Sequence, residues 1–188
     1  MRVLKLTVAY DGGAYVGWQR QADGTSIQGL IEEALARIEG QSVTVTGAGR
    51  TDAGVHALGQ VASVRVETTH GADTYVRALN AALPEDVRVR RVEVMPETFH
   101  ARFDARAKTY RYRILAGPIA SPFELRYAWH VTFPSIARPC GSRWRRAWAS
   151  MTSPPSKQPA ASSAARCGRS IGRRWRRRGV MSIRRRRC

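Results

Sequence analysis

Cysteine is missing from the first 139 residues of this sequence, and no stretch of about 18 consecutive apolar residues occurs in it. No cysteine or histidine group has zinc-ligand spacing either, so we predict a protein without a metal site. The lack of a long apolar stretch excludes a membrane-spanning helix. Residues 1–10 alternate apolar and polar side chains and do not form the apolar block of a signal peptide. We therefore expect a cytoplasmic protein that contacts no membrane.

Acidic residues are missing from residues 132–188, a segment that we call the tail. Residues 1–131 contain 16 basic and 14 acidic residues, and the tail contains the other 16 of the 32 basic residues. The net charge of +18 is therefore mainly a property of the tail. A block of charge of one sign is typical of an arm that binds nucleic acid. The tail also lacks hydrophobic periodicity, so we predict that it is disordered.

Residues 1–95 show the patterns of strand, helix, strand, strand, helix and strand, in that order. This order is typical of the ferredoxin-like split βαβ fold, so we predict an α+β protein with an antiparallel sheet. A fifth strand follows and would open a second unit of the same kind. The predicted strands are 3–10, 43–48, 59–67, 87–95 and 107–116, and the predicted helices are 25–38 and 72–83.

The ends of the first helix are also marked in the sequence. Thr25 with Gln28 three residues later matches a capping box, and Gly40 is a typical residue just after a helix. For the whole chain we predict three parts: an α/β domain over 1–104, the first strand region of a second domain over 105–131, and the tail.

The segment Gly47–Ala57, with the sequence Gly-Ala-Gly-Arg-Thr-Asp-Ala-Gly-Val-His-Ala, is the strongest candidate for a functional site. Three glycines in eight residues permit an irregular backbone. Asp52 stands between Arg50 and His56 on a connection between two strands, a common location for functional groups. The alternative is an ordinary strand connection in which Asp52 caps a turn.

This segment resembles the active-site loop of the tRNA pseudouridine synthase A family. Three further segments match that family in order and spacing, and the resemblance covers residues 1 to about 131. The four segments are Tyr10–Gln21 (with Tyr-Asp-Gly and Gly-Trp-Gln-Arg-Gln), Gly47–Ala57, Phe99–Phe103 (Phe-His-Ala-Arg-Phe) and Tyr110–Tyr112 (Tyr-Arg-Tyr).

The resemblance implies an isomerase that converts uridine to pseudouridine in the anticodon stem-loop of tRNA. It also implies a homodimer whose partner is tRNA, without a cofactor or a metal. The bond from the sugar to N1 breaks, the base rotates, and a bond to C5 forms. Asp52 matches the family's catalytic aspartate, which would act as a covalent nucleophile or as a proton acceptor. The sequence leaves both routes open.

Two further residues are candidates for substrate binding. Arg50 would hold the RNA backbone or take the place of the flipped base, because a guanidinium both stacks and pairs with phosphate. An ion pair with Asp52 is the alternative. Tyr110 matches the family's active-site tyrosine, which stacks on the target base. From the strand pattern alone Tyr110 could equally be a core residue, and Tyr112 is as good a candidate.

Other polar and aromatic residues of the four segments point less clearly to a function. Isolated histidines such as His56 and His100 are more often structural partners than bases or ligands. Trp18 and the run 19–21 would contact RNA or another subunit, since arginine and glutamine suit phosphate and sugar contacts.

The family's second α/β half does not follow residue 131 in this sequence. Shifting the reading frame by one base turns the codons of Met151 and Thr152 into Asp, and those of Trp148 and Ala149 into Gly. With permitted codon choices, 148–156 becomes Gly-Glu-His-Asp-Phe-Ala-Ala-Phe and 165–172 becomes Thr-Val-Arg-Thr-Ile-Tyr-Arg. Both resemble parts of the missing half, so our hypothesis is a frameshift near Phe133 or Pro134.

A frameshift would remove the arginine that, in the family, pairs with the catalytic aspartate. It would also leave the 107–116 strand with an unpaired edge. We therefore expect little or no activity from the polypeptide as given. A module that binds RNA non-specifically through the tail is the alternative function, and a gene product without function is a third possibility.

The frameshift hypothesis makes a direct prediction about the gene. Sequencing between the codons of Trp129 and Arg138 should reveal a gained or lost base relative to a frame that encodes the second half. A confirmed, uninterrupted frame at this point would contradict the hypothesis.

Overall fold

The computed structural model describes residues 1–132, 173–176 and 180–186. The chain divides into two compact units, Met1–Ala105 and Arg106–Cys188. Among the helices in these ranges, none is long and apolar enough to cross a membrane.

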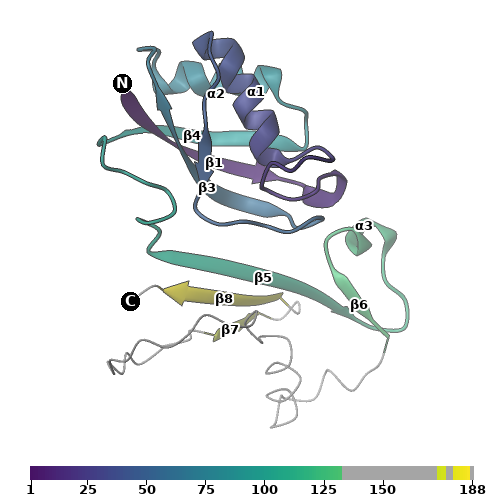
Figure 1. Cartoon of the computed structure of the whole chain (residues 1–188). Helices are drawn as coiled ribbons and strands as arrows, with labels where there is room; N and C mark the ends of the chain where they lie inside the picture. Colours follow the sequence, from purple (N-terminus) through teal and green to yellow (C-terminus); the bar gives the residue numbers. More distant parts are fainter. Residues whose placement is uncertain (133–172, 177–179, 187–188) are drawn as a thin grey trace. The chain divides into compact units, whose positions relative to one another are not determined.

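The first unit is a four-stranded antiparallel sheet covered on one face by two helices (Figure 1). The strand order is β2-β3-β1-β4. This order confirms the predicted ferredoxin-like arrangement, in which the two strand–helix–strand halves interlock. Its elements are β1 (Arg2–Tyr10), η1 (Gly12–Ala14), α1 (Ile27–Glu39), β2 (Val45–Gly47), β3 (Ala57–Val66), α2 (Ala72–Ala82) and β4 (Val87–Met95).

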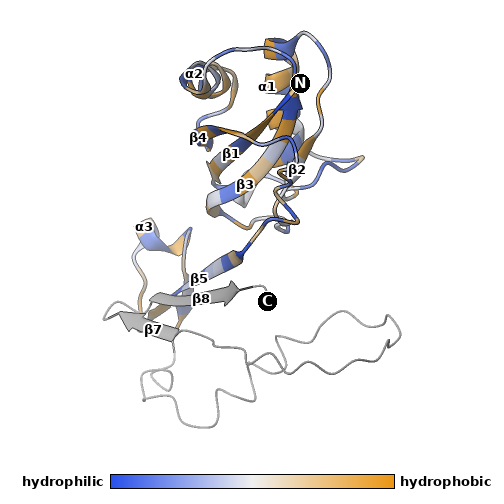
Figure 2. Cartoon of the chain, turned by 90° about the vertical axis from the view of Figure 1, so that its left-hand side faces the viewer, coloured by the Kyte–Doolittle hydropathy of each residue, from blue (hydrophilic) through white to orange (hydrophobic). Residues whose placement is uncertain are grey.

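The core lies between the helices and the sheet face that they cover, and both helices lie over the same side of the sheet in Figure 2 as well. Alternate residues of β1 point into it, which follows from the period of two along a strand. Burial of each such leucine, isoleucine or valine contributes about 1.5–3 kcal/mol to folding. Its fully buried residues include Leu4, Leu6 and Val8 of β1, Ile27, Ile31 and Leu35 of α1, and Tyr75 and Leu79 of α2.

The start of α1 differs from the prediction. Ser26, and not Thr25, is the N-cap, and its Oγ accepts a hydrogen bond from Gly29 N at 3.1 Å. The predicted capping box is therefore wrong, because the Gln28 side chain instead donates to Val45 O at 3.0 Å and so ties the helix to β2. Gly40 is confirmed as the end of the helix, with φ of 72° in the left-handed region.

The second unit contains a sheet with the strand order β6-β5-β8-β7. β5 pairs in parallel with β6 and antiparallel with β8, and β8 pairs antiparallel with β7. Its elements are β5 (Ala107–Ala116), α3 (Pro122–Leu125), β6 (Trp129–Val131), β7 (Arg173–Arg176) and β8 (Val180–Arg186).

Two sequence expectations are corrected by β7 and β8. Both segments lie in the tail, where we predicted disorder, and β8 pairs with the edge of β5 that we expected to stay unpaired. A strand edge supplies backbone donors and acceptors to any extended segment, and composition does not reveal this partner. The rest of the predicted disorder lies outside the described residues.

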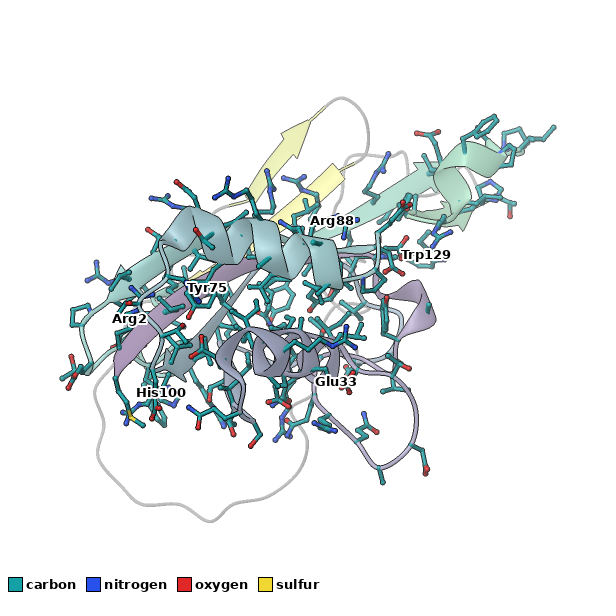
Figure 3. All side chains as sticks on the ribbon, turned by 90° about the horizontal axis from the view of Figure 1, so that it is seen from above. Arg2, Glu33, Tyr75, Arg88, His100 and Trp129 are labelled. Carbon is teal, nitrogen blue, oxygen red and sulfur yellow. The ribbon has the colours of Figure 1, made fainter. Side chains whose placement is uncertain are left out.

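A polar cluster ties the end of α1 to the connection between β3 and α2. Glu39 accepts hydrogen bonds from Thr68 Oγ1 at 2.7 Å and from the backbone N–H groups of Glu67 and Thr68 at 3.1 and 3.2 Å. The hydroxyl of the buried Tyr75 also donates to it. Arg2 lies beside Tyr75, with its guanidinium carbon 5.8 Å from the ring centre (Figure 3).

These contacts set the pKa of both ionisable partners. Burial raises the pKa of Glu39, but the hydrogen bonds from Tyr75, Thr68 and two backbone N–H groups outweigh it, so the net pKa is lowered. Burial and the hydrogen bond to Glu39 raise the pKa of Tyr75. Because the pKa of Glu39 is lowered in the folded protein, its ionised carboxylate stabilises the fold at pH values above the ordinary glutamate pKa. This stabilisation is lost as the pH falls through the lowered pKa.

Glu39→Gln should therefore lower the free energy of unfolding by about 1–2 kcal/mol at about pH 7, because Gln lacks the charged acceptor. The difference between the two proteins should shrink at a second, lower pH, below the lowered pKa of Glu39, where the wild-type carboxylate is protonated. Urea unfolding at both pH values measures it. Glu33→Gln, on the exposed face of the same helix, is the matched control and should change stability little at either pH. An equal loss at both pH values would contradict the assignment.

Candidate active site

The candidate site is built on the connection between β2 and β3, residues 48–56, which we call the aspartate loop. The ends of the loop continue the sheet. Ala48 N donates to Val61 O at 2.7 Å, and the side-chain amide of Gln60 donates to Gly49 O. The loop is therefore mounted on two paired strands, which limits the movement of its ends.

A second connection, residues 11–19, packs against the aspartate loop; we call it the support loop. Trp18 N donates to Thr51 O at 3.0 Å, and Gly54 N donates to Tyr15 O at 3.4 Å. At the end of β1, the Tyr10 hydroxyl and Thr51 Oγ1 are hydrogen-bonded at 2.8 Å. These bonds hold the backbone immediately before and after Asp52.

The two loops approach so closely that side chains are excluded at two glycines of the support loop. A Cβ added at Gly12 would lie 2.1 Å from Val55 O, and one at Gly17 would lie 2.4 Å from Thr51 O. Gly17 also has φ of 109°, which an L-residue with a side chain rarely adopts. The glycines of the Tyr-Asp-Gly and Gly-Trp sequences are thus required by the contact with the aspartate loop.

A side-chain contact joins the same two loops. His56 Nδ1 lies 2.9 Å from Asp11 Oδ1 and 3.1 Å from Gly12 N. The Asp11 carboxylate also accepts a hydrogen bond from Gly13 N at 3.0 Å and so caps the short helix η1. His56 is therefore a structural partner of the support loop, as expected for an isolated histidine.

The support loop is in turn anchored to the turn before β4. The Tyr15 hydroxyl donates to Asp86 Oδ1 at 2.5 Å, and Asp11 N donates to Asp86 O at 2.9 Å. Burial, and then the bond to the Asp86 carboxylate, raise the pKa of Tyr15. Sequence reasoning missed this anchor. Asp86 looked like a turn residue, and only the position of Tyr15 inside a family-like segment could have pointed to it.

Asp52 is exposed at the tip of the aspartate loop. Its carbonyl accepts a hydrogen bond from Val55 N at 3.2 Å, which closes a turn around Gly54, whose φ is 77°. Within the part of the chain that the structure describes, the Asp52 carboxylate makes no hydrogen bond and no ion pair. The backbone is thus tied down while the carboxylate itself is accessible to a substrate.

Arg50 is also exposed. Over the described residues no ion pair joins it to Asp52, so the alternative that these two residues simply neutralise each other is not observed. Its guanidinium is accessible for contact with a phosphate.

The Phe99–Phe103 segment forms a compact turn that contacts the sheet. Ala101 is buried, and its N–H donates to Ser63 Oγ of β3 at 3.1 Å. The His100 ring accepts a hydrogen bond from Arg102 N at 3.2 Å and lies 4.3 Å from the ring of Phe103, centre to centre. His100 therefore has structural partners within its own turn.

Trp18 is 2% exposed and packs against Tyr10 with ring centres 6.2 Å apart. The expectation that its ring contacts RNA or another subunit is therefore wrong. Gly47 leaves the space that the buried indole occupies, because a Cβ added at Gly47 would lie 2.4 Å from the indole nitrogen. Arg20 and Gln21 remain exposed after it.

Tyr110 lies on β5 in the second unit and is 47% exposed, and Tyr112 is 52% exposed. Neither is a core residue, so the alternative role considered for Tyr110 is not observed. The choice between the two tyrosines stays a prediction. No group of three or more potential metal ligands occurs among the residues that the structure describes.

Comparison with known proteins places these segments in a family context. Residues 6–104 match the family model described as tRNA pseudouridine synthase. The chain is 46% identical over 134 residues to tRNA pseudouridine synthase A of Solibacter usitatus, covering 71% of this chain and 56% of the relative. It is 46% identical over 132 residues to the protein of that name from Akkermansia muciniphila, covering 69% and 50%. The chain thus spans about half the length of the curated relatives it matches.

The contact between the two loops can be tested at its glycines. Gly17→Ala should lower the free energy of unfolding by about 3 kcal/mol, because the methyl group meets a backbone carbonyl in a strained conformation. Gly40→Ala is the matched control: its φ is also positive but no atom lies within 4 Å of the added Cβ, so it should cost only about 1 kcal/mol. Urea unfolding of both variants measures the difference. Equal losses would show that the loops are not in tight contact.

Proposed function

Because the chain belongs to the tRNA pseudouridine synthase family, we propose that its first unit carries the catalytic loop of an enzyme that isomerises uridine to pseudouridine in tRNA. Asp52 is the residue that acts on the substrate. The supporting observation is an exposed carboxylate on a loop whose backbone is held on both sides by the support loop. A group held in this way reacts without first losing conformational freedom.

The reaction explains why a carboxylate is needed. When the bond between the sugar and N1 breaks, the sugar carbon becomes electron-poor, and a carboxylate can attack it or stabilise it. In the alternative route the carboxylate attacks the electrophilic ring of the uracil. In both routes the bond to the carboxylate breaks again and a carbon bond forms between the sugar and C5, while C5 loses its proton and N1 gains one. Substrate and product have the same atoms, so the net reaction consumes no oxidant, reductant or group donor.

Arg50 and Tyr110 are the proposed substrate-binding residues. A base within a stem must leave its stack before Asp52 can reach it. The exposed guanidinium of Arg50, two residues before Asp52, suits the phosphate backbone or the space that the base leaves. The exposed ring of Tyr110 suits stacking on the base.

The wider setting of the proposed enzyme follows from its family resemblance. We propose that the substrate site lies in the anticodon stem-loop, that the enzyme is a homodimer and that it works in the cytoplasm. The family's second half, which supplies an arginine for the aspartate, would be needed for full activity.

Non-specific RNA binding is the second candidate function, and the charge of the tail supports it. The tail has 16 basic residues and no acidic residue, so it would neutralise phosphates irrespective of sequence. Such binding would weaken steeply with salt and would not require Asp52.

Replacement of Asp52 separates the two functions. Tritium release from tRNA labelled at C5 of uridine should be measured for the chain as given and for the product of a gene with the frame restored near Phe133. We expect little or no release from the first and clear release from the second. Asp52→Asn in the frame-restored protein should lower the rate at least about a thousandfold, because the nucleophile is lost.

The control is Asp73→Asn, an exposed aspartate in the first turn of α2, which should keep the rate within about twofold. Binding of tRNA should survive both substitutions. Undiminished release by Asp52→Asn would overturn the role of Asp52. Binding without release from either wild-type protein would favour the non-specific RNA-binding function.

A further inference from the structure

The position of Asp52 depends on its neighbours, because its own carboxylate has no partner within the described residues. Two backbone hydrogen bonds hold the aspartate loop, one at Thr51 and one at Gly54. Between them the chain turns at Gly54, whose φ of 77° lies in the left-handed region that glycine adopts without steric cost. A third attachment after Gly54 is needed to keep the turn, and with it Asp52, in one conformation.

His56 provides that third attachment. It is the last residue of the aspartate loop, immediately before β3 begins at Ala57. Its Nδ1 lies 2.9 Å from Asp11 Oδ1, within hydrogen-bond distance. The Asp11 side chain is 14% exposed and the His56 side chain 34%, so the contact is partly shielded from water.

Asp11 is itself held at two points, which makes it a firm anchor. Its carboxylate caps η1 through Gly13 N, and its backbone N–H donates to Asp86 O at 2.9 Å. Contacts therefore run continuously from the turn before β4, through Asp11 and His56, to the aspartate loop. None of these residues needs to touch the substrate.

We propose that His56, through its contact with Asp11, is a positioning residue that holds the aspartate loop in the conformation in which Asp52 reacts. This proposal rests on the proposed function. It assigns His56 a role in the rate of the reaction that is distinct from substrate binding and from proton transfer.

Amide hydrogen exchange tests the attachment without any need for activity. In the chain as given, His56→Ala should accelerate exchange at the N–H groups of Trp18 and Gly54 about tenfold, since both donate across the two loops. Exchange in the middle of β1, for example at Leu6, should not change. His56→Asn should restore slow exchange, because the asparagine amide nitrogen can replace Nδ1 opposite Asp11.

Two further variants define the pair. Asp11→Ala should reproduce the effect of His56→Ala, and the double variant should add little, as expected for residues that act through one contact. His70→Ala is the matched control: His70 is exposed and its carbonyl oxygen, which the substitution keeps, accepts a hydrogen bond from Arg2, so exchange at Trp18 and Gly54 should stay as in the wild type. Unchanged exchange in His56→Ala would overturn the proposal.

Turnover connects the attachment to catalysis. In the frame-restored protein of the tritium-release experiment, His56→Ala should lower kcat about tenfold and leave KM within about twofold, and His56→Asn should recover most of the loss. Faster exchange with an unchanged kcat would show that the contact is merely structural and would overturn the positioning role. If Asp52→Asn keeps full turnover, the proposed function fails, while the exchange result still decides whether His56 holds the loop.

Discussion

The close approach of two loop backbones is the constraint on which the site depends. The support loop reaches the aspartate loop only because Gly12 and Gly17 carry no Cβ, and a side chain at either position would overlap a carbonyl oxygen of Val55 or Thr51. This approach places the N–H of Trp18 opposite the carbonyl of Thr51. The hydrogen bond compensates the desolvation of both groups, so the loop beside Asp52 is held by backbone contacts and not by its own side chain.

Several features of the first unit serve this contact. The split βαβ topology brings the end of β1 next to the start of β3, so the loops that follow and precede these strands become neighbours. Trp18 fills the space beneath Gly47 and links the support loop to the core. Asp86, in the turn before β4, holds Tyr15 and the backbone of Asp11 from the other side. The rigidity that the chemistry needs is thus supplied by three strand connections of one unit.

An exposed carboxylate on a firmly held loop combines two requirements that usually conflict. A reactive group must be accessible, but accessible loops are usually mobile and carry few contacts. Here the anchors lie on the backbone, at the flanking residues and at His56, while the Asp52 carboxylate makes no hydrogen bond or ion pair within the described ranges. The second unit has its own sheet around β5. Its link to this chemistry is the proposed role of Tyr110 in stacking on the base.

The sequence by itself determined the order of strands and helices in the first unit, the end of α1 at Gly40 and the segment that carries Asp52. Local periodicity and glycine positions reflect the conformation of residues near one another in the chain, so they are readable without a structure. Tertiary structure decided the burial of Trp18, the cap at Ser26, the pairing of β8 with β5 and the joining of Asp11, His56 and Asp86. Each depends on residues far apart in the sequence whose proximity is set by strand pairing and packing, and no local pattern encodes that proximity.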